Sequence, residues 1–281
     1  MQTVLEILKK TTDFFTTKHI EDARLEAEIL LAHGLGLKRM DLYLQFDRPL
    51  TDEELAKMRP LVQRRGQREP IQHIIGSVGF RHLEIKTDAR ALIPRPDTEQ
   101  IIDLANTLIQ EKSDVSALEI GVGTGAILLS LVHENSQIQK AVGVDISQDA
   151  LNLAQENASL CKIESIEWIL SDLFTNIPQQ QFDLIISNPP YIPTSVCAEL
   201  EIEVKKYDPM LALDGGISGL DIYERIFVDA KSYLKPNGHL LFEIGYDQGQ
   251  SVPDLGIHLG WTLVGVHKDY GSNDRFVCFK N

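Results

Sequence analysis

The spacing of apolar residues changes near residue 70. Before that point apolar side chains recur every three or four positions, as at Leu25, Ile29 and Leu30, which is the spacing of a helix with one buried face. Thr51 followed by Glu54 is a capping-box signature that predicts the start of a further helix. These patterns predict a small bundle of about four or five helices, which we interpret as a substrate-recognition domain over residues 1–68.

Beyond about residue 97, extended apolar runs alternate with helical patterns. Strands are expected at 116–120, 139–145, 166–171, 182–187, 238–245, 262–267 and 275–280, with helices at 98–110, 125–133, 148–158, 219–234 and 247–259. This alternation predicts an α/β fold with a mostly parallel seven-stranded sheet covered by helices on both faces. The last two strands follow one another without a helix, so we expect them to pair antiparallel at one edge.

Residues 69–90 read as a linker with a β-hairpin between the helical domain and a catalytic domain at 91–281. We expect its first strand at 71–76, its turn at 77–79 and its second strand at 80–86. Nearby basic residues admit two interpretations, a solvated helix face, which we favour, or a partner-binding patch. They are Arg59, Arg64, Arg65 and Arg68.

Composition and charge limit the classes of protein to which this chain can belong. The net charge of −14 and pI near 5.0 disfavour stable binding to nucleic acid, which depends on clustered Lys and Arg. No apolar run approaches the roughly 20 residues that span a bilayer, and the first residues lack a signal-peptide pattern, so a cytoplasmic protein without membrane contact is expected. Cys161, Cys197 and Cys278 are far apart and predict reduced thiols and no metal site.

A glycine-rich turn follows the first expected strand of the sheet. Gly121, Gly123 and Gly125 alternate with Val122 and Thr124 before an apolar helical run, and such a turn lets a ligand approach the backbone. The turn contains no Lys and differs in spacing from dinucleotide and P-loop motifs, which favours a nucleoside without phosphates. A tight turn without a ligand remains the alternative.

Asp145 ends the second expected strand, 20 positions after Gly125. A carboxylate at that place can accept both hydroxyls of a ribose. The alternative is an N-cap on the following helix, although Ser147 can also fill that position.

The stretch Asn188-Pro189-Pro190-Tyr191 follows an apolar run and offers hydrogen-bond acceptors almost without donors, because proline has no backbone N–H. The Asn188 side-chain oxygen and the Pro189 carbonyl are therefore suited to hold a planar NH₂ group, with the Tyr191 ring against its plane. The alternative is that the two prolines only end a strand.

Together with Ser171 and Asp172 after the third strand, these features resemble the S-adenosylmethionine-binding half of a Rossmann-like class I methyltransferase. The resemblance implies S-adenosylmethionine as the cofactor and S-adenosylhomocysteine as its product. It also implies that Asp172 lies near the adenine amino group, Leu173 against the adenine ring, and Asn188 where the methyl group is transferred.

Further motifs in order resemble the HemK/PrmC-type release-factor glutamine methyltransferases. They are Glu69-Pro70-Ile71-Gln72-His73-Ile74-Ile75-Gly76, Leu92-Ile93-Pro94-Arg95-Pro96-Asp97-Thr98-Glu99, Tyr207-Asp208-Pro209, Ala212-Leu213-Asp214-Gly215-Gly216 and Asp269-Tyr270-Gly271-Ser272-Asn273-Asp274-Arg275. Departures from that family are Glu119, where Asp is usual, and Val122, where Thr is usual.

This resemblance implies methyl transfer to the side-chain amide nitrogen of the glutamine in the Gly-Gly-Gln motif of bacterial peptide chain release factors, a modification that belongs to translation termination. Two alternatives remain open from the residues themselves. One is an exocyclic amino methyltransferase that acts on a nucleic-acid base, against which the acidic charge counts. The other is a silent S-adenosylmethionine-binding module, against which the intact residues 188–191 count.

Overall fold

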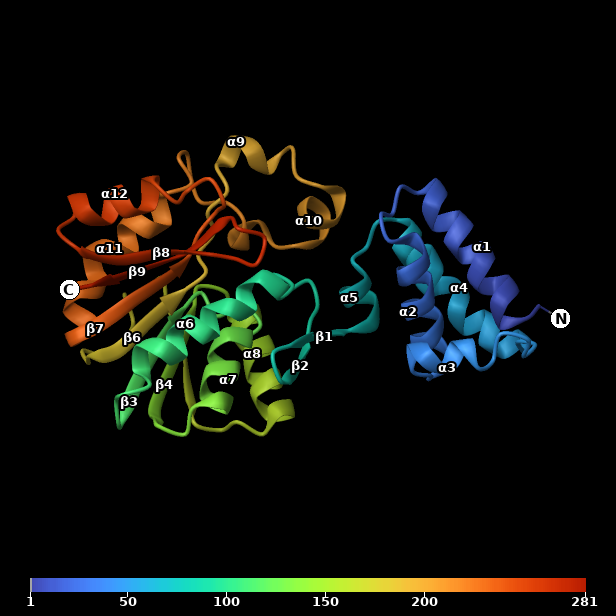
Figure 1. The fold of residues 1–281 in the computed structure, drawn as a ribbon, viewed down its shortest axis with the longest axis horizontal. Coiled ribbons are helices and arrows are strands. Elements are labelled where there is room, and N and C mark those ends of the chain that lie inside the picture. Colours follow the sequence, from blue (N-terminus) through green and yellow to red (C-terminus); the bar gives the residue numbers. More distant parts are fainter. Residues whose placement is uncertain (1) are drawn as a thin grey trace. The chain divides into compact units, whose positions relative to one another are not determined.

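The computed structural model describes residues 2–281, which divide into two compact units. The first extends up to Ser77 and also includes Ile202–Tyr207, whereas the second contains Val78–Glu201 and Asp208–Asn281. Each unit has its own apolar core. Figure 1 shows the order of their elements along the chain.

The first unit is a bundle of helices, as the sequence predicts. Its core contains the fully buried side chains of Leu8, Phe15, Leu30 and Leu31. The Thr51 side chain accepts a hydrogen bond from the backbone N–H of Glu54, which confirms the predicted capping box. The helices are α1 (Val4–Thr17), α2 (Ala23–Leu35), α3 (Arg39–Tyr43), α4 (Asp52–Gly66), α5 (Ile71–Ile75) and the later α10 (Ile202–Tyr207).

Ion pairs tie α10 to the other helices of this unit. Arg65 is only 5% exposed, and its guanidinium contacts the carboxylates of Glu26 and, at 3.2 Å, Glu203. Arg68 donates to the same Glu203 at 2.7 Å. The interpretation of this basic cluster as a solvated helix face is therefore wrong for Arg65. Its partner Glu203 lies far along the chain, so local sequence offered no sign of the pairing.

The predicted hairpin exists, but it lies later in the chain than expected. Residues 71–75 form helix α5, which ends at Gly76 with φ of 88°, a conformation that suits glycine. The strands are β1 (Ser77–Phe80) and β2 (Leu83–Lys86), so the expected turn at 77–79 is itself a strand. The true turn includes Arg81, whose positive φ of 53° is uncommon for a residue with a side chain and is hard to infer from sequence.

The second unit contains a seven-stranded sheet in the order β5-β4-β3-β6-β7-β9-β8. Neighbouring strands from β5 to β7 are parallel, and β9 pairs antiparallel with both β7 and β8. The predicted α/β fold and the antiparallel pair at one edge are confirmed. The strands are β3 (Val115–Ile120), β4 (Ile138–Asp145), β5 (Ile166–Leu170), β6 (Phe182–Ser187), β7 (Leu234–Glu243), β8 (Thr262–Lys268) and β9 (Asp274–Lys280).

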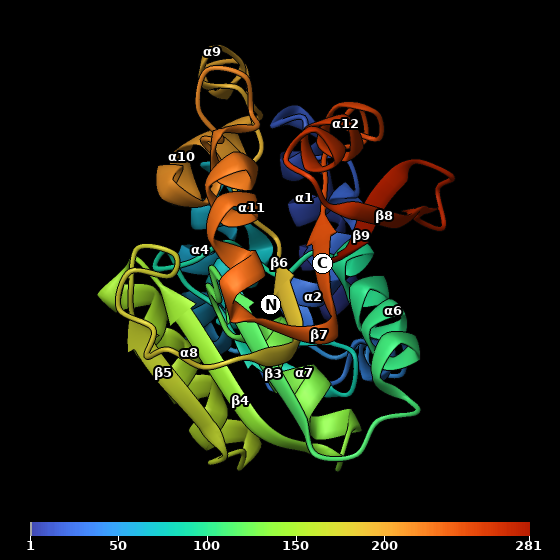
Figure 2. The same ribbon diagram turned by 90° about the vertical axis from the view of Figure 1, so that its left-hand side faces the viewer.

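Helices cover both faces of this sheet (Figures 1 and 2). One core contains side chains of α6 (Gln100–Ile109), α7 (Ala126–Glu134) and α8 (Gln148–Cys161), and the other contains those of α11 (Asp221–Tyr233) and α12 (Ser251–His258). Adjacent residues of β6 show the alternation, because Ile186 belongs to the first core and Ile185 to the second.

Besides α5 and α10, three further short helices were not expected from the sequence. They are η1 (Pro96–Glu99), α9 (Thr194–Cys197) and η2 (Met210–Ala212). The last two lie in the long connection between β6 and α11, which has only short apolar stretches. In the part of the chain that the structure describes, no helix is long and apolar enough to cross a membrane.

Candidate functional site

The order of the strands creates a natural ligand site. From β3 the chain moves outward to β4 and β5 and then returns to β6 on the other side of β3. The loops that follow β3 and β6 therefore run in opposite directions and leave a crevice at the carboxyl ends of these two strands. A cavity of about 460 Å³ lies there, and every residue that lines it belongs to the second unit. The predicted site residues in its lining are Gly121, Val122, Gly123, Thr124, Asp145, Asp172, Leu173, Asn188, Pro189 and Pro190.

The glycine loop between β3 and α7 needs its glycines. Gly121, Gly123 and Gly125 have φ of 74°, 54° and 81°, in the left-handed region that other residues rarely adopt. A side chain at Gly125 would also crowd Ala154, Leu129 and Trp168 at 3.1 to 3.3 Å. The loop is thus both sharply turned and closely packed, and Gly125 serves the turn and is not among the residues that line the cavity.

Asp145 joins the glycine loop to the end of β4. Its two carboxylate oxygens accept the backbone N–H groups of Gly123 and Ser147, each at 2.9 Å. Burial raises the pKa of Asp145, and these backbone N–H groups oppose that effect. Ser147 caps α8 by accepting from the N–H of Ala150, so Asp145 does not serve as the N-cap. The carboxylate retains acceptor capacity for a further donor.

Glu119 lies in β3 and is 1% exposed. Its Oε2 accepts the backbone N–H of Leu128 at 2.9 Å, so it satisfies a free donor in the first turn of α7. Burial raises the pKa of Glu119 well above its ordinary value, and the nearby charge of Asp145 acts in the same direction. The departure from the usual Asp is compatible with this helix-capping contact.

Asn157 supports the glycine loop through side-chain hydrogen bonds, a role that the sequence did not indicate. Its Nδ2 donates to the carbonyl oxygens of Thr124 at 2.9 Å and Lys86 at 3.0 Å, while its Oδ1 accepts the N–H of Lys86 at 2.7 Å. This fully buried amide links α8, strand β2 and the loop. An isolated Asn in a helix gives no sequence signal for such contacts.

The turn after β5 brings Asp172 and Leu173 to the cavity. Leu173 has a positive φ of 49°, a strained conformation that tends to persist where function requires it. The Ser171 hydroxyl stabilises the turn by donating to the Leu173 carbonyl at 2.8 Å and accepting from the Asn176 N–H at 3.0 Å. Asp172 forms an ion pair with Arg225 at 2.8 Å, a partner that the sequence did not indicate.

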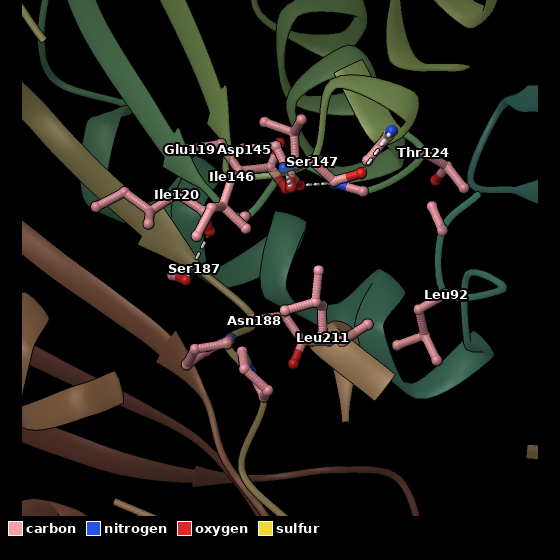
Figure 3. Close-up of a pocket in the computed structure, with 18 of the residues that line it drawn as sticks. Leu92, Glu119, Ile120, Thr124, Asp145, Ile146, Ser147, Ser187, Asn188 and Leu211 are labelled. Atoms are coloured by element: carbon pink, nitrogen blue, oxygen red, sulfur yellow. Dashed lines mark hydrogen bonds between the residues drawn. The ribbon is translucent and has the colours of Figure 1, made fainter. Parts of the chain in front are cut away.

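Asn188 begins the connection after β6. The preceding Ser187 is fully buried, and its hydroxyl donates to the Ile120 carbonyl at 2.7 Å, which fixes the end of β6 beside β3. In Figure 3, Asn188 and Leu211 lie across the hollow from Glu119 and Asp145. Pro189 and Pro190 also line the cavity, so its wall there offers backbone carbonyl groups without N–H groups.

A second segment supports the backbone of residues 188–191. Ile192 forms a parallel bridge with Asp214, with hydrogen bonds of 3.0 Å to the Leu213 carbonyl and 2.8 Å from the Gly215 N–H. A Cβ atom added at Gly215 would lie 2.7 Å from the Tyr191 Cα and 2.8 Å from the Pro190 carbonyl oxygen. The motif of residues 212–216 therefore packs directly on the motif of residues 188–191.

Gln248 is a further supporting residue that the sequence did not reveal. Its Nε2 donates to the carbonyl oxygens of Tyr191 at 3.2 Å and Gly219 at 3.1 Å, and its Oε1 accepts the Gly245 N–H at 2.9 Å. It is 7% exposed. A single buried side chain thus connects the ends of β6 and β7 with the loop before α11.

Tyr191 is half-buried and packs against the core that contains α11 and α12. Burial and the neighbouring Glu243 raise its pKa to about 12, so the hydroxyl is neutral near pH 7. Arg275 lies close to this hydroxyl and is itself held by Asp269 at 3.1 Å. Tyr191 is not among the residues that line the cavity, and its expected stacking on an acceptor amide stays a prediction.

The structure thus brings most of the predicted site residues to one cavity from four different loops. Within residues 2–281 there is no cluster of His, Cys, Asp and Glu that could hold a metal ion. Cys161, Cys197 and Cys278 are free.

Comparison with known proteins shows what the chain is similar to. Residues 6–76 match the PrmC N-terminal domain, and residues 111–251 match a methyltransferase domain. A release factor glutamine methyltransferase of Geobacter sulfurreducens is 41% identical over 98% of this chain and 95% of the relative. Another, from Agrobacterium fabrum, is 38% identical over 93% of this chain and 91% of the relative.

Among solved structures, the ribosomal protein L11 methylase of Lactobacillus delbrueckii subsp. bulgaricus superposes with a TM-score of 0.54. The alignment covers 73% of this chain and 98% of that protein, with 16% sequence identity. At this identity the likeness concerns the fold alone.

Proposed function

Because the chain belongs to the release factor glutamine methyltransferases, we propose that it transfers a methyl group from S-adenosylmethionine to the side-chain amide nitrogen of the glutamine in the Gly-Gly-Gln motif of peptide chain release factors. The observation that carries this proposal is the wall formed by Asn188, Pro189 and Pro190. Asn188 lies across the cavity from Asp145 (Figure 3), and the wall to which it belongs offers acceptors for an NH₂ group.

The cavity fits a nucleoside-type cofactor. A ligand can approach the loop backbone closely at Gly121, because this residue has no side chain and the space where a Cβ would stand is open to 4 Å. The Asp145 carboxylate keeps acceptor capacity for ribose hydroxyls. Asp172 and Leu173 supply an acceptor and an apolar surface for the base. We therefore assign Gly121, Val122, Gly123, Thr124, Asp145, Asp172, Leu173 and Asn188 to cofactor binding, and Gly125, which does not line the cavity, to the turn that shapes the loop.

When bound, S-adenosylmethionine supplies an electrophilic methyl group on a positively charged sulfur. The protein's task is to present an amide nitrogen, which is a poor nucleophile because its lone pair is delocalised into the carbonyl. The Asn188 side-chain oxygen and the Pro189 carbonyl each accept one amide hydrogen. These fixed acceptors orient the nitrogen and favour the positive charge that develops on it.

Catalysis of this kind rests on orientation more than on proton transfer. Well-placed hydrogen bonds of a preorganised site are typically worth about 10² to 10³ in rate each. The proton released from the methylated nitrogen passes to water, so a strong base at the site is not required. Pro190 contributes by lacking an N–H, and Tyr191 by flanking the acceptor position.

The two units divide the work in this proposal. All residues that line the cavity lie in the second unit, so the cofactor site is complete without the helices of the first. We assign recognition of the release factor to the helical unit, around residues 1–68, with residues 69–90 as the linker. Because release factors act on ribosomes, the enzyme would work in the cytoplasm and modify translation termination.

The proposal is tested by mass spectrometry of a purified release factor after incubation with the protein and labelled S-adenosylmethionine. We expect one added methyl group, on the glutamine of the Gly-Gly-Gln motif. A release factor with Glu in place of that Gln is the matched control, because Glu is nearly isosteric but supplies no NH₂. Unpaired acceptors at such a site discriminate by about 10⁴ or more.

Bulk nucleic acid is incubated in parallel. Label in a base rather than in the release factor would instead support the exocyclic amino methyltransferase. Label in neither, with cofactor binding intact, would contradict both functions.

A further inference from the structure

Glu243 lies next to Asn188 at the end of the sheet. Strands β6 and β7 are parallel, with Ile186 paired to Leu241 and Ser187 to Phe242. Asn188 and Glu243 are the next residues of the two chains. Because side chains alternate along a strand, both point to the face on which Ile186 and Leu241 contribute to the core beneath α6.

The Glu243 side chain is buried and incompletely paired. It is 3% exposed, and its Oε2 meets no hydrogen-bond donor among residues 2–281. Its backbone is held independently, since the Tyr223 hydroxyl donates to the Glu243 carbonyl at 2.8 Å. A buried carboxyl with a free oxygen is costly unless a nearby donor uses it. The Asn188 side-chain NH₂ is a donor close to this carboxyl.

Several charged or polar groups face this carboxyl. Burial raises the pKa of Glu243 to about 7, and Asp97 adds to that effect, whereas Thr98, Arg275 and Asn188 lower it. Glu243 therefore changes charge near neutral pH. The titratable and charged groups around it are Asp97 of η1, Arg275 of β9, Tyr191 after β6 and Tyr223 of α11.

We propose that Glu243 is a positioning residue for the acceptor site: its carboxylate receives an N–H of the Asn188 side chain and thereby turns the Asn188 oxygen toward the substrate amide. This inference rests on the proposed function of Asn188. Glu243 itself does not line the cavity, so it acts through Asn188 and not on the substrate.

The two ends of an Asn amide have nearly the same shape, so packing alone does not select between them. With the amide reversed, the Asn188 NH₂ would meet the substrate NH₂, and two donors would face each other. An ionised carboxylate accepts only, which excludes the reversed orientation. A protonated carboxyl can donate to the Asn188 oxygen and so permits it. The rate of methyl transfer should therefore fall as pH decreases through about 7.

The test is a Glu243→Gln variant in single-turnover methylation of a release factor at saturating S-adenosylmethionine, from pH 6 to pH 9. A neutral hydrogen bond replaces a charge-assisted one, so we expect a rate loss of about 5-fold to 10-fold at pH 8. The acidic limb of the wild-type profile should disappear, while cofactor affinity changes less than about 2-fold. Glu167→Gln, an exposed glutamate of strand β5, is the matched control and should keep the wild-type profile.

A double-mutant cycle separates positioning from a general structural effect. If Glu243 acts through Asn188, Glu243→Gln should cause no further loss in a protein that already carries Asn188→Ala. Losses that multiply, or a Glu243→Gln profile that keeps the acidic limb, would overturn the inference. If Glu243→Gln does not fold, a wild-type profile without a limb near pH 7 overturns it equally.

The outcomes also separate this inference from the proposed function. Wild-type protein that transfers no methyl group to the release factor contradicts both. Wild-type methylation with an unaffected Glu243→Gln variant contradicts the positioning role alone.

Discussion

Gly215→Ala probes the contact between residues 212–216 and the acceptor motif. The added Cβ would lie 2.7 Å from the Tyr191 Cα, 2.8 Å from the Pro190 carbonyl oxygen and 2.9 Å from the Tyr191 carbonyl carbon. All three neighbours are backbone atoms, so no flexible side chain can move aside. To restore an ordinary contact of 3.4 Å, the two segments must separate by about 0.7 Å.

This displacement should affect both stability and rate. Forcing an extra carbon into a packed site typically costs about 1 to 3 kcal/mol in the free energy of unfolding. A shift approaching 1 Å in catalytic groups can lower a rate by about 10²-fold. Cofactor affinity should change by less than about 2-fold, because Asp145 and the glycine loop form the opposite wall.

Urea unfolding measures the loss of stability, single-turnover methylation the rate, and calorimetry the affinity for S-adenosylmethionine. Gly79→Ala is the matched control, since a Cβ at that exposed strand position meets no atom within 4 Å. It should leave all three quantities near wild type. A folded Gly215→Ala protein that transfers methyl groups at the wild-type rate would refute the claim that this packing holds the acceptor motif in place.

Four further outcomes are expected. Asp145→Ala should weaken S-adenosylmethionine binding by roughly 1.5 to 3 kcal/mol in calorimetry, the range for hydrogen bonds to charged groups; unchanged affinity in a folded protein would contradict the ribose assignment. Asn188→Ala should lower kcat by roughly 10² to 10³, whereas Asn188→Asp, which keeps an acceptor oxygen, should lose less. A chain that begins at Val78 should bind cofactor but not methylate full-length release factor; because Ile202–Tyr207 then lacks its partners, thermal unfolding must first show that it folds. Finally, burial raises the pKa of Glu243 to about 7. The folded protein therefore holds the Glu243 proton more tightly than the unfolded chain does, and the free energy of unfolding decreases as pH rises from about 4.5 to about 7. Urea unfolding at pH 8 should therefore find Glu243→Gln more stable than wild type by about 1 to 3 kcal/mol, and a destabilised variant would contradict this.

Much of the site was predictable because its signals are local. Three glycines in alternate positions, an acid at a strand end and two consecutive prolines each have conformational or hydrogen-bonding consequences that do not depend on distant residues. Alternating patterns also predicted the sheet, because a buried parallel strand must be apolar along its length. The hairpin was displaced because its register depends on a left-handed conformation at Arg81, for which the sequence carries no marker.

The sequence by itself determined the class of fold and the places where the chain turns toward the cavity, and the chemistry expected of Asn188 and Asp145 stays a prediction from it. Only the tertiary structure decided which polar side chains hold those places. Asn157, Gln248 and Glu243 act through partners that follow or precede them by many residues, as does Arg65 with Glu203 in the helical unit. The physical reason is that a buried polar group is satisfied by whatever the fold brings within about 3 Å, and spacing along the chain does not encode that proximity.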